Sequence, residues 1–225
     1  MPQFLPFRGI RYDAGVQAHD SIDAVVAPPY DVIDEDQRVV LAERNPHNAV
    51  RLILPEGDDD TRYARAASTF DTWQRERTLR RDPEPAFYLY QMRFRDRDGH
   101  ARETTGVIGA LQLPEQGDDS VLPHERTLPK AKSDRLSLLR ATRANFDPIW
   151  GLSLTAGLSE VLGPPPVNGV SCTDDQGVVH TVSPVTDPGR LAAIAEAVGR
   201  ARLVLADGHH RFETALSFRD ELRAR

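Results

Sequence analysis

Hydrophobic and polar residues alternate along the chain in short runs, and most runs end at a proline or a glycine. The clearest helical period lies between residues 59 and 79, where five apolar residues share one face. These residues are Tyr63, Ala66, Ala67, Phe70 and Trp73. Residues 34–44 predict a second helix, with Asp34 as its N-cap and Gln37 completing a capping box. Three further helices are expected over residues 133–144, with Ser133 as the cap, 188–201 and 211–223.

Short runs of apolar, aromatic or β-branched residues predict the strands. Residues 86–95 and 103–113 would form a hairpin around Asp98-Gly99, because Asp-Gly favours a tight turn. A second pair, 170–173 and 178–183, would enclose another turn. Single strands are expected over residues 22–27, 49–54, 150–154 and 202–206. Hairpins mixed with crossovers indicate an α+β or mixed α/β fold, with mixed sheets and flanking helices rather than one parallel sheet.

Composition and charge exclude several classes of protein. The 225 residues are 40% hydrophobic with a net charge of −6, which suits one large or two small domains. We expect an N-terminal α+β region over residues 1–113 and a second region over 114–225. No apolar run is long enough to span a membrane. The first residues show no basic flank followed by an apolar stretch, so we expect no secretory signal. The single cysteine, Cys172, excludes an internal disulfide. These features predict a cytoplasmic protein without a membrane partner.

Positive charge is concentrated between residues 126 and 143, where six Lys or Arg residues accompany one acidic residue. Lys130 and Arg135 belong to this stretch and could neutralise a polyphosphate. The alternative is a solvated amphipathic helix, with Leu136 and Leu139 facing the core and the arginines facing water. The overall acidity of the chain argues against a nucleic-acid partner.

The strongest chemical signal follows the apolar run 203–206, where Asp207-Gly208-His209-His210-Arg211 leads into the last predicted helix. Backbone amides at a helix start attract anions, and Gly208 can adopt a positive φ and let a phosphate approach. Arg211 could bind phosphate through two N–H groups, and the histidines add donors. Asp207 could hold a metal ion or orient a hydroxyl. The alternative is a tight turn with a solvated histidine pair.

A second polar segment, residues 121–130, contains His124 and Glu125 between Pro123 and Pro129. Prolines would stiffen this segment, and Glu125 could serve as a general base. A solvated loop is the alternative. A zinc site built from His209, His210, His124 and Asp207 would lack the usual helical ligand spacing.

Two further segments are ambiguous from sequence alone. Tyr30 and Asp31 follow Pro28-Pro29 and could line a cleft, and residues 145–148 (Asn-Phe-Asp-Pro) read as a helix stop with polar residues. The chain contains no Gly-x-x-x-x-Gly-Lys-Ser/Thr loop, no Gly-x-Gly-x-x-Gly turn and no Gly-x-Ser-x-Gly elbow. These absences argue against a P-loop enzyme, a Rossmann dehydrogenase and a serine hydrolase.

Nearly the whole chain resembles one family of bacterial and archaeal proteins, catalogued as domain of unknown function 1015. The matching stretches are residues 7–12, 27–33, 48–54, 121–130, 134–147 and 206–216. Members of this family typically continue well beyond the Asp-Gly-His-His-Arg turn, so we expect this chain to be truncated. The turn itself resembles the phosphate-binding turn of the ParB/sulfiredoxin superfamily. That superfamily includes free-serine kinases, sulfiredoxins and CTP-binding partition proteins.

The resemblance implies a ParB/sulfiredoxin-like unit in the C-terminal half that binds a nucleotide, ATP or ADP, and transfers a phosphoryl group to a small hydroxylated metabolite such as serine. Glu125 would then be the base, and Asp207 would act in catalysis and hold Mg²⁺. The residues expected to bind the nucleotide are Gly208, His209, His210, Arg211, His124, Lys130 and Arg135. The alternative function is a non-catalytic module that senses a nucleotide or phosphometabolite.

Overall fold

The computed structural model describes residues 1–13, 21–58, 61–123 and 129–225. The chain forms two compact units that alternate along the sequence. Unit 1 comprises residues 1–11, 81–122 and 152–204, and unit 2 comprises residues 12–80, 123–151 and 205–225. Each unit combines helices with strands, which confirms the predicted α+β class.

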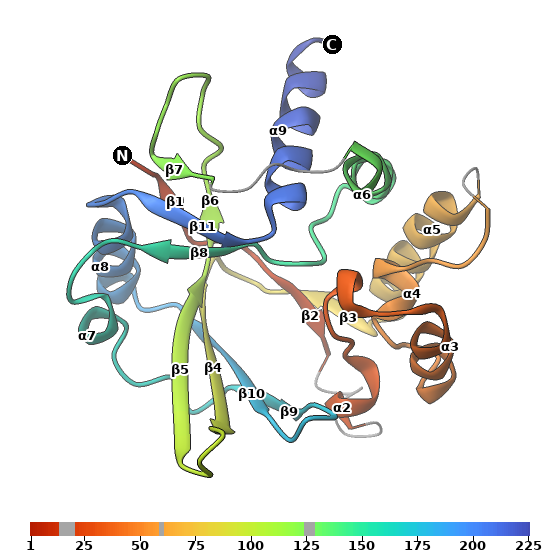
Figure 1. Cartoon of the computed structure of the whole chain (residues 1–225), viewed down its shortest axis with the longest axis horizontal. Coiled ribbons are helices and arrows are strands. Elements are labelled where there is room, and N and C mark those ends of the chain that lie inside the picture. Colours follow the sequence, from red (N-terminus) through yellow and green to blue (C-terminus); the bar gives the residue numbers. More distant parts are fainter. Residues whose placement is uncertain (14–20, 59–60, 124–128) are drawn as a thin grey trace. The chain divides into compact units, whose positions relative to one another are not determined.

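Unit 1 is built on a four-stranded antiparallel sheet with the order β5-β4-β10-β9. Its strands are β4 (Phe87–Arg95), β5 (Ala101–Ile108), β9 (Val170–Thr173) and β10 (Val179–Val185). Figure 1 shows β4 and β5 as a long hairpin, which confirms the turn predicted at Asp98-Gly99. A second, two-stranded antiparallel sheet pairs β1 (Phe4–Leu5) with β6 (Ala110–Leu111).

Helices α7 (Leu158–Leu162) and α8 (Pro188–Gly199) pack against each other in unit 1. Asp187 caps α8 by accepting a hydrogen bond from the Arg190 amide at 2.8 Å, and Pro188 occupies the first turn. The buried core joins the sheet to both helices. Its members are Phe87, Leu89, Leu162, Val185 and Ile194.

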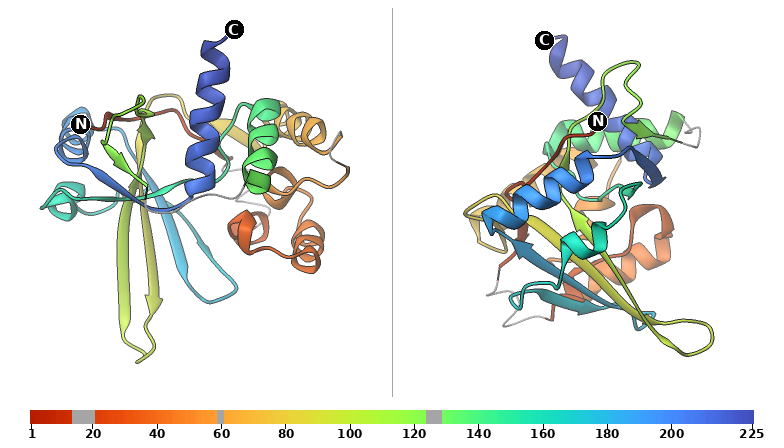
Figure 2. Two further views of the ribbon diagram at one scale, coloured as in Figure 1. Left: turned by 45° about the horizontal axis from the view of Figure 1, so that its top comes forward. Right: turned by 90° about the vertical axis from the view of Figure 1, so that its left-hand side faces the viewer.

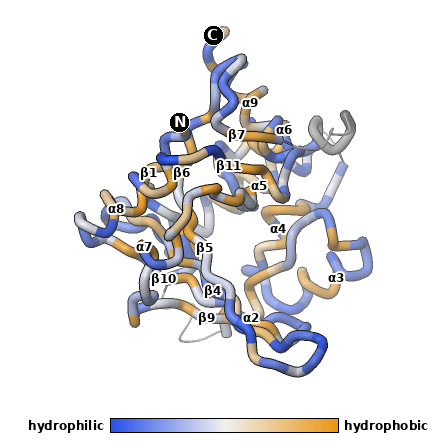
Figure 3. Tube along the Cα trace, turned by 60° about the vertical axis from the view of Figure 1, so that its left-hand side comes forward, coloured by the Kyte–Doolittle hydropathy of each residue, from blue (hydrophilic) through white to orange (hydrophobic). Residues whose placement is uncertain are grey.

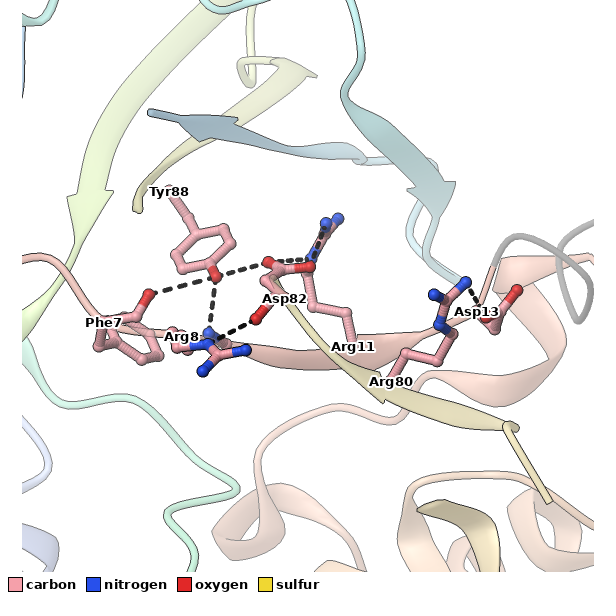
Figure 4. Close-up of polar contacts among 8 residues, drawn as sticks. Phe7, Arg8, Arg11, Asp13, Arg80, Asp82 and Tyr88 are labelled. Carbon is pink, nitrogen blue, oxygen red and sulfur yellow. Dashed lines mark hydrogen bonds and ion pairs between the residues drawn. The ribbon is translucent and has the colours of Figure 1, made fainter. Parts of the chain in front are cut away.

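The N-terminal segment of unit 1 is held by the carboxylate of Asp82, as Figure 4 shows. Asp82 accepts two hydrogen bonds from Arg11, at 2.8 and 2.9 Å, and one from the Tyr88 hydroxyl at 2.6 Å. The Tyr88 hydroxyl accepts in turn from the Gly9 amide at 2.7 Å. Burial opposes ionisation of Asp82, but the bonds from Arg11 and Tyr88 outweigh it and lower the pKa of Asp82.

Unit 2 is mainly helical. Its helices are α2 (Ile22–Val25), the 3₁₀ helix η1 (Tyr30–Val32), α3 (Glu35–Arg44), α4 (Val50–Ile53), α5 (Arg62–Arg75), α6 (Pro129–Thr142) and α9 (His209–Arg223). Helix α6 packs against both α5 and α9, as Figure 2 shows. Hydrophobic residues gather along α4 in Figure 3, and these residues are buried together with Phe70, Trp73, Leu138 and Phe212.

The remaining strands form two small sheets. β2 (Ile10–Tyr12) pairs with β3 (Leu79–Arg81), and the second sheet has the order β7-β11-β8. Its strands are β7 (Val121–Leu122), β8 (Trp150–Ser153) and β11 (Leu203–Asp207), and β7 runs parallel to β11. The strand predicted over residues 202–206 is therefore confirmed, and it leads into α9.

Two predicted strands are wrong, because residues 22–27 and 49–54 contain the short helices α2 and α4. Each segment has five apolar residues and one charged residue, a pattern that fits a buried helical turn as well as a strand. The buried Asn48 decides the outcome, since its side-chain amide donates to the carbonyls of Ala24 and Val26 at 2.8 and 2.9 Å. Its side-chain oxygen accepts from the Val50 amide at the start of α4.

Two helix starts also differ from the prediction. Helix α6 begins at Pro129, so Ser133 lies within the helix rather than at its cap. Helix α9 begins at His209 rather than Arg211. Among the described residues, none of the helices combines the length and apolar character needed to cross a membrane.

Replacing Asp82 with asparagine should destabilise the protein by about 2 kcal/mol at neutral pH, because Arg11 and Tyr88 would lose a partly buried charged partner. Because the folded-state pKa of Asp82 is lowered, its contribution is present above the ordinary aspartate pKa and is lost as the pH falls through the folded-state value. Urea unfolding at several pH values measures this difference.

The exposed Asp98 in the β4–β5 turn offers a matched control, and Asp98→Asn should change stability by no more than about 0.5 kcal/mol. Equal losses in the two variants would contradict the role assigned to Asp82.

Candidate functional site

The candidate site is the corner of unit 2 where β11 ends and α9 begins. Gly208 connects the two elements with a φ of +90°, in the left-handed region that glycine tolerates best. A Cβ atom at this position would lie 3.1 Å from Arg211 Nε and 3.3 Å from the Ile149 Cα. Both the backbone conformation and the surrounding atoms therefore favour glycine here.

Helix α9 starts at this corner without a capping side chain at Gly208. The first hydrogen bond of the helix runs from the Phe212 amide to the Gly208 carbonyl at 2.9 Å. The amides of the first turn precede that bond, so they lie at the positive end of the helix dipole. This is the local structure that the sequence predicted for an anion site.

Arg211 folds back over the corner, and its side chain is only 11% exposed. Its Nη2 donates to Asp207 Oδ2 at 2.6 Å, and its Nη1 donates to the Pro148 carbonyl. Asp207 is 59% exposed, so this ion pair lies at the surface of unit 2. A guanidinium held in this way adds positive charge to the corner in a fixed orientation.

The histidine pair is not a solvated turn. His209 is 6% exposed and lies in the first turn of α9, and His210 is partly buried beside it. The alternative of a solvated histidine pair is therefore wrong for His209.

Arg135 is also buried, with 6% of its surface exposed. Its Nε and Nη2 donate to Asp134 Oδ2 at 2.8 and 2.5 Å, and its Nη1 donates to the Ile53 carbonyl at 2.8 Å. Its guanidinium stacks over the Tyr30 ring at 4.1 Å. The alternative in which the arginines of this helix face water is thus wrong for Arg135, because Asp134 neutralises its charge inside the unit.

Asp134 binds more than one cation. Besides Arg135, it accepts hydrogen bonds from Arg62 at 2.9 Å and from the Tyr63 hydroxyl at 2.8 Å. Burial opposes ionisation of Asp134, but the charge of Arg135 and these hydrogen bonds lower the pKa of the carboxyl. The network joins α5 to α6. A hollow of about 220 Å³ lies beside it and includes Arg38, Glu35 and Glu56 in its lining.

Two residues outside the predicted set belong to the same electrostatic neighbourhood. Asp147 lies directly before Pro148, and its carboxyl interacts with the charges of Arg135, Arg211 and Asp31. Burial raises the pKa of the Asp147 carboxyl and Asp31 adds to the effect, whereas the two arginines oppose it. Burial likewise raises the pKa of Tyr30, whose hydroxyl interacts with the same groups.

The sequence marked the segments that contain Tyr30, Asp31 and Asp147 without assigning them chemistry. Only the fold reveals that the Pro-Pro-Tyr-Asp turn, the Asn-Phe-Asp-Pro turn and the β11–α9 corner share one charge environment. The sequence contained little indication of a functional role for the Pro-Pro-Tyr-Asp and Asn-Phe-Asp-Pro segments, because each has the residues of an ordinary turn.

The other residues predicted for the site belong to the polar segment of residues 121–130. His124 and Glu125 lie outside the described residues, and the backbone of Lys130 lies in the first turn of α6. Within the described part of the chain, three metal-ligating side chains come together at Asp96, Asp98 and His100 in the β4–β5 turn. Asp207 belongs to no such group there.

The sequence matches the family described as "Protein of unknown function (DUF1015)" over residues 4–225. The match covers nearly the whole chain, so the protein belongs to this family, as the motifs in its sequence predicted. Comparison with curated proteins and with solved structures gives no match.

Replacing Gly208 with alanine should destabilise the fold more than the same change at Gly177. Both glycines have a φ near +80 to +90°, but only Gly208 has atoms close to the added Cβ. We expect about 1 kcal/mol of backbone strain in each variant, and a further loss only in Gly208→Ala as Arg211 and Ile149 adjust. Chemical denaturation of the two variants measures the difference, and equal losses would contradict the tight packing of the corner.

Proposed function

We propose that this protein binds the phosphate groups of a nucleotide, ATP or ADP, at the β11–α9 corner and transfers a phosphoryl group to a small hydroxylated metabolite such as serine. One observation carries the proposal: a left-handed glycine, the first turn of a helix and a fixed arginine meet at one place. This combination is the common protein arrangement for phosphate recognition.

The contacts of Arg211 supply the means of recognition. Its bonds to Asp207 and to the Pro148 carbonyl hold the guanidinium beside the first amides of α9. A phosphate at the helix start would share Arg211 with Asp207, whose exposed carboxylate could turn toward solvent or toward a Mg²⁺ ion carried by the nucleotide. His209 and His210 would add donors from the same turn.

Phosphoryl transfer needs positioning and charge neutralisation more than covalent chemistry by the protein. In this proposal Lys130 and His124, which belong to the other polar segment of the sequence, also bind the phosphates. Arg135, which is paired with Asp134 and stacks on the Tyr30 ring, supports the binding site from within the unit. Glu125 is the base implied by the family resemblance.

Arg211→Met should weaken nucleotide binding at least about tenfold, because a charged bidentate donor would be lost. Thermal-shift titrations with ATP, ADP and CTP, each with and without Mg²⁺, measure the apparent dissociation constants. Arg75→Met on the exposed end of α5 is the matched control and should bind like the natural chain. Equal affinity in the natural chain, Arg211→Met and Arg75→Met would show that the β11–α9 corner does not bind the nucleotide.

If Glu125 is the base, as the family resemblance implies, Glu125→Gln abolishes phosphoryl transfer and leaves nucleotide binding intact, because glutamine keeps the shape of the side chain but cannot accept a proton at neutral pH. Purified protein incubated with MgATP or MgADP and L-serine provides the assay, with phosphoserine as the product. Nucleotide binding without turnover, in the natural chain and the variant alike, would favour the sensing module over the enzyme.

A further inference from the structure

Asp147 is held in place from three sides within unit 2. After α6, Arg143 turns the chain with a left-handed φ of +50°. The Phe146 ring then packs edge-on against Phe70 of α5, with 5.2 Å between the ring centroids. On the other side of Asp147, the Pro148 carbonyl accepts a hydrogen bond from Arg211. The backbone of Asp147 is therefore fixed at the edge of the β11–α9 corner.

The carboxyl group of Asp147 lies among charges that are bound elsewhere. Arg135 is engaged by Asp134 and the Ile53 carbonyl, and Arg211 is engaged by Asp207 and the Pro148 carbonyl. Tyr30 and Asp31 approach from η1 and are the other groups that act on it. Among the described residues, the partly buried Asp147 carboxyl itself makes neither a hydrogen bond nor an ion pair.

This arrangement differs from that of a structural carboxylate. Asp82 and Asp134, which are also partly buried, are both hydrogen-bonded to neighbouring side chains. Of the other aspartates of the corner, Asp207 is paired with Arg211 and Asp31 is exposed. A carboxyl group that is held rigidly beside an anion site and kept from its neighbours suits acid–base chemistry.

We propose that Asp147 is the catalytic base of the corner and takes the proton of the acceptor hydroxyl. The inference rests on the proposed function and assigns to Asp147 the role that the family resemblance gives to Glu125. The acceptor oxygen forms a bond to the terminal phosphorus, and the bond from that phosphorus to the bridging oxygen breaks. The nucleotide leaves with that electron pair, and the proton moves to Asp147 and then to water.

The first test compares Asp147→Asn with Asp71→Asn, the same change at an exposed position of α5. In the MgATP or MgADP assay with L-serine, Asp147→Asn should lower kcat by about 100-fold or more, with nucleotide affinity unchanged within about twofold. Asp147→Glu should recover part of the activity. Asp71→Asn should behave as the natural chain.

The pH profile separates Asp147 from the nearby histidines. Because the pKa of Asp147 is raised, the fall of kcat/KM on the acid side of the pH profile should occur above the ordinary pKa range of aspartate. In Asp147→Asn, kcat/KM should no longer depend on pH in this range. A fall caused by His209 or His210 would remain in the variant, and its persistence unchanged would overturn the assignment.

Thermal unfolding gives a measure that does not depend on activity. Because burial raises the folded-state pKa of Asp147, ionisation costs stability, and Asp147→Asn should melt at an equal or higher temperature at neutral pH. This gain in melting temperature should vanish as the pH falls below the ordinary aspartate pKa, because Asp147 of the natural chain is then protonated in both the folded and the unfolded state. A large loss of melting temperature at neutral pH would indicate a structural role and overturn the proposal.

The outcomes distinguish this inference from the proposed function. A natural chain that binds no nucleotide, or that binds one and transfers no phosphoryl group to serine or water, overturns both. Transfer that survives in Asp147→Asn but is lost in Glu125→Gln overturns only the assignment of Asp147. Transfer lost in Asp147→Asn but retained in Glu125→Gln supports it.

Discussion

The left-handed turn at Gly208 is the constraint on which the candidate site depends. It lets the chain leave β11 and enter α9 within one residue, so the start of the helix lies directly beside the end of the strand. It also leaves space for the Arg211 guanidinium and the Ile149 backbone, which a larger residue would displace. The direction of α9 and the position of its only first-turn arginine both follow from this one backbone conformation.

The second determinant is the way unit 2 uses its basic residues. The positive stretch around α6 looks, in sequence, like a surface for a polyanion. In the folded unit Arg135 is neutralised by Asp134 beneath Tyr30, and Arg140 pairs with Glu221 of α9. Arg135 and Arg140 therefore link α6 to neighbouring helices through hydrogen bonds and an ion pair. Arg135 also contributes to the electrostatic environment of Asp147 at the corner.

Three aspartates near the corner show how environment divides chemical roles. Asp134 is surrounded by donors and stays ionised, and Asp207 shares Arg211 at the surface. Among the residues that the structure describes, Asp147 has no direct hydrogen-bond or ion-pair partner, and burial raises its pKa. Three aspartates of one unit therefore differ in their hydrogen-bond partners and exposure, although their side chains are identical.

The sequence by itself determined the features that depend on neighbouring residues. The amphipathic period of α5, the Asp34 cap of α3, the Asp-Gly hairpin and the glycine corner are local signals, and each is confirmed. Only the tertiary structure decided whether residues 22–27 and 49–54 became helices, since the buried Asn48 links them across the fold. It also decided that Asp147, Tyr30 and Arg135 share one environment. The protonation of a buried side chain depends on groups that lie close in space but far apart in the sequence. Local sequence patterns do not show which of these groups the fold brings together.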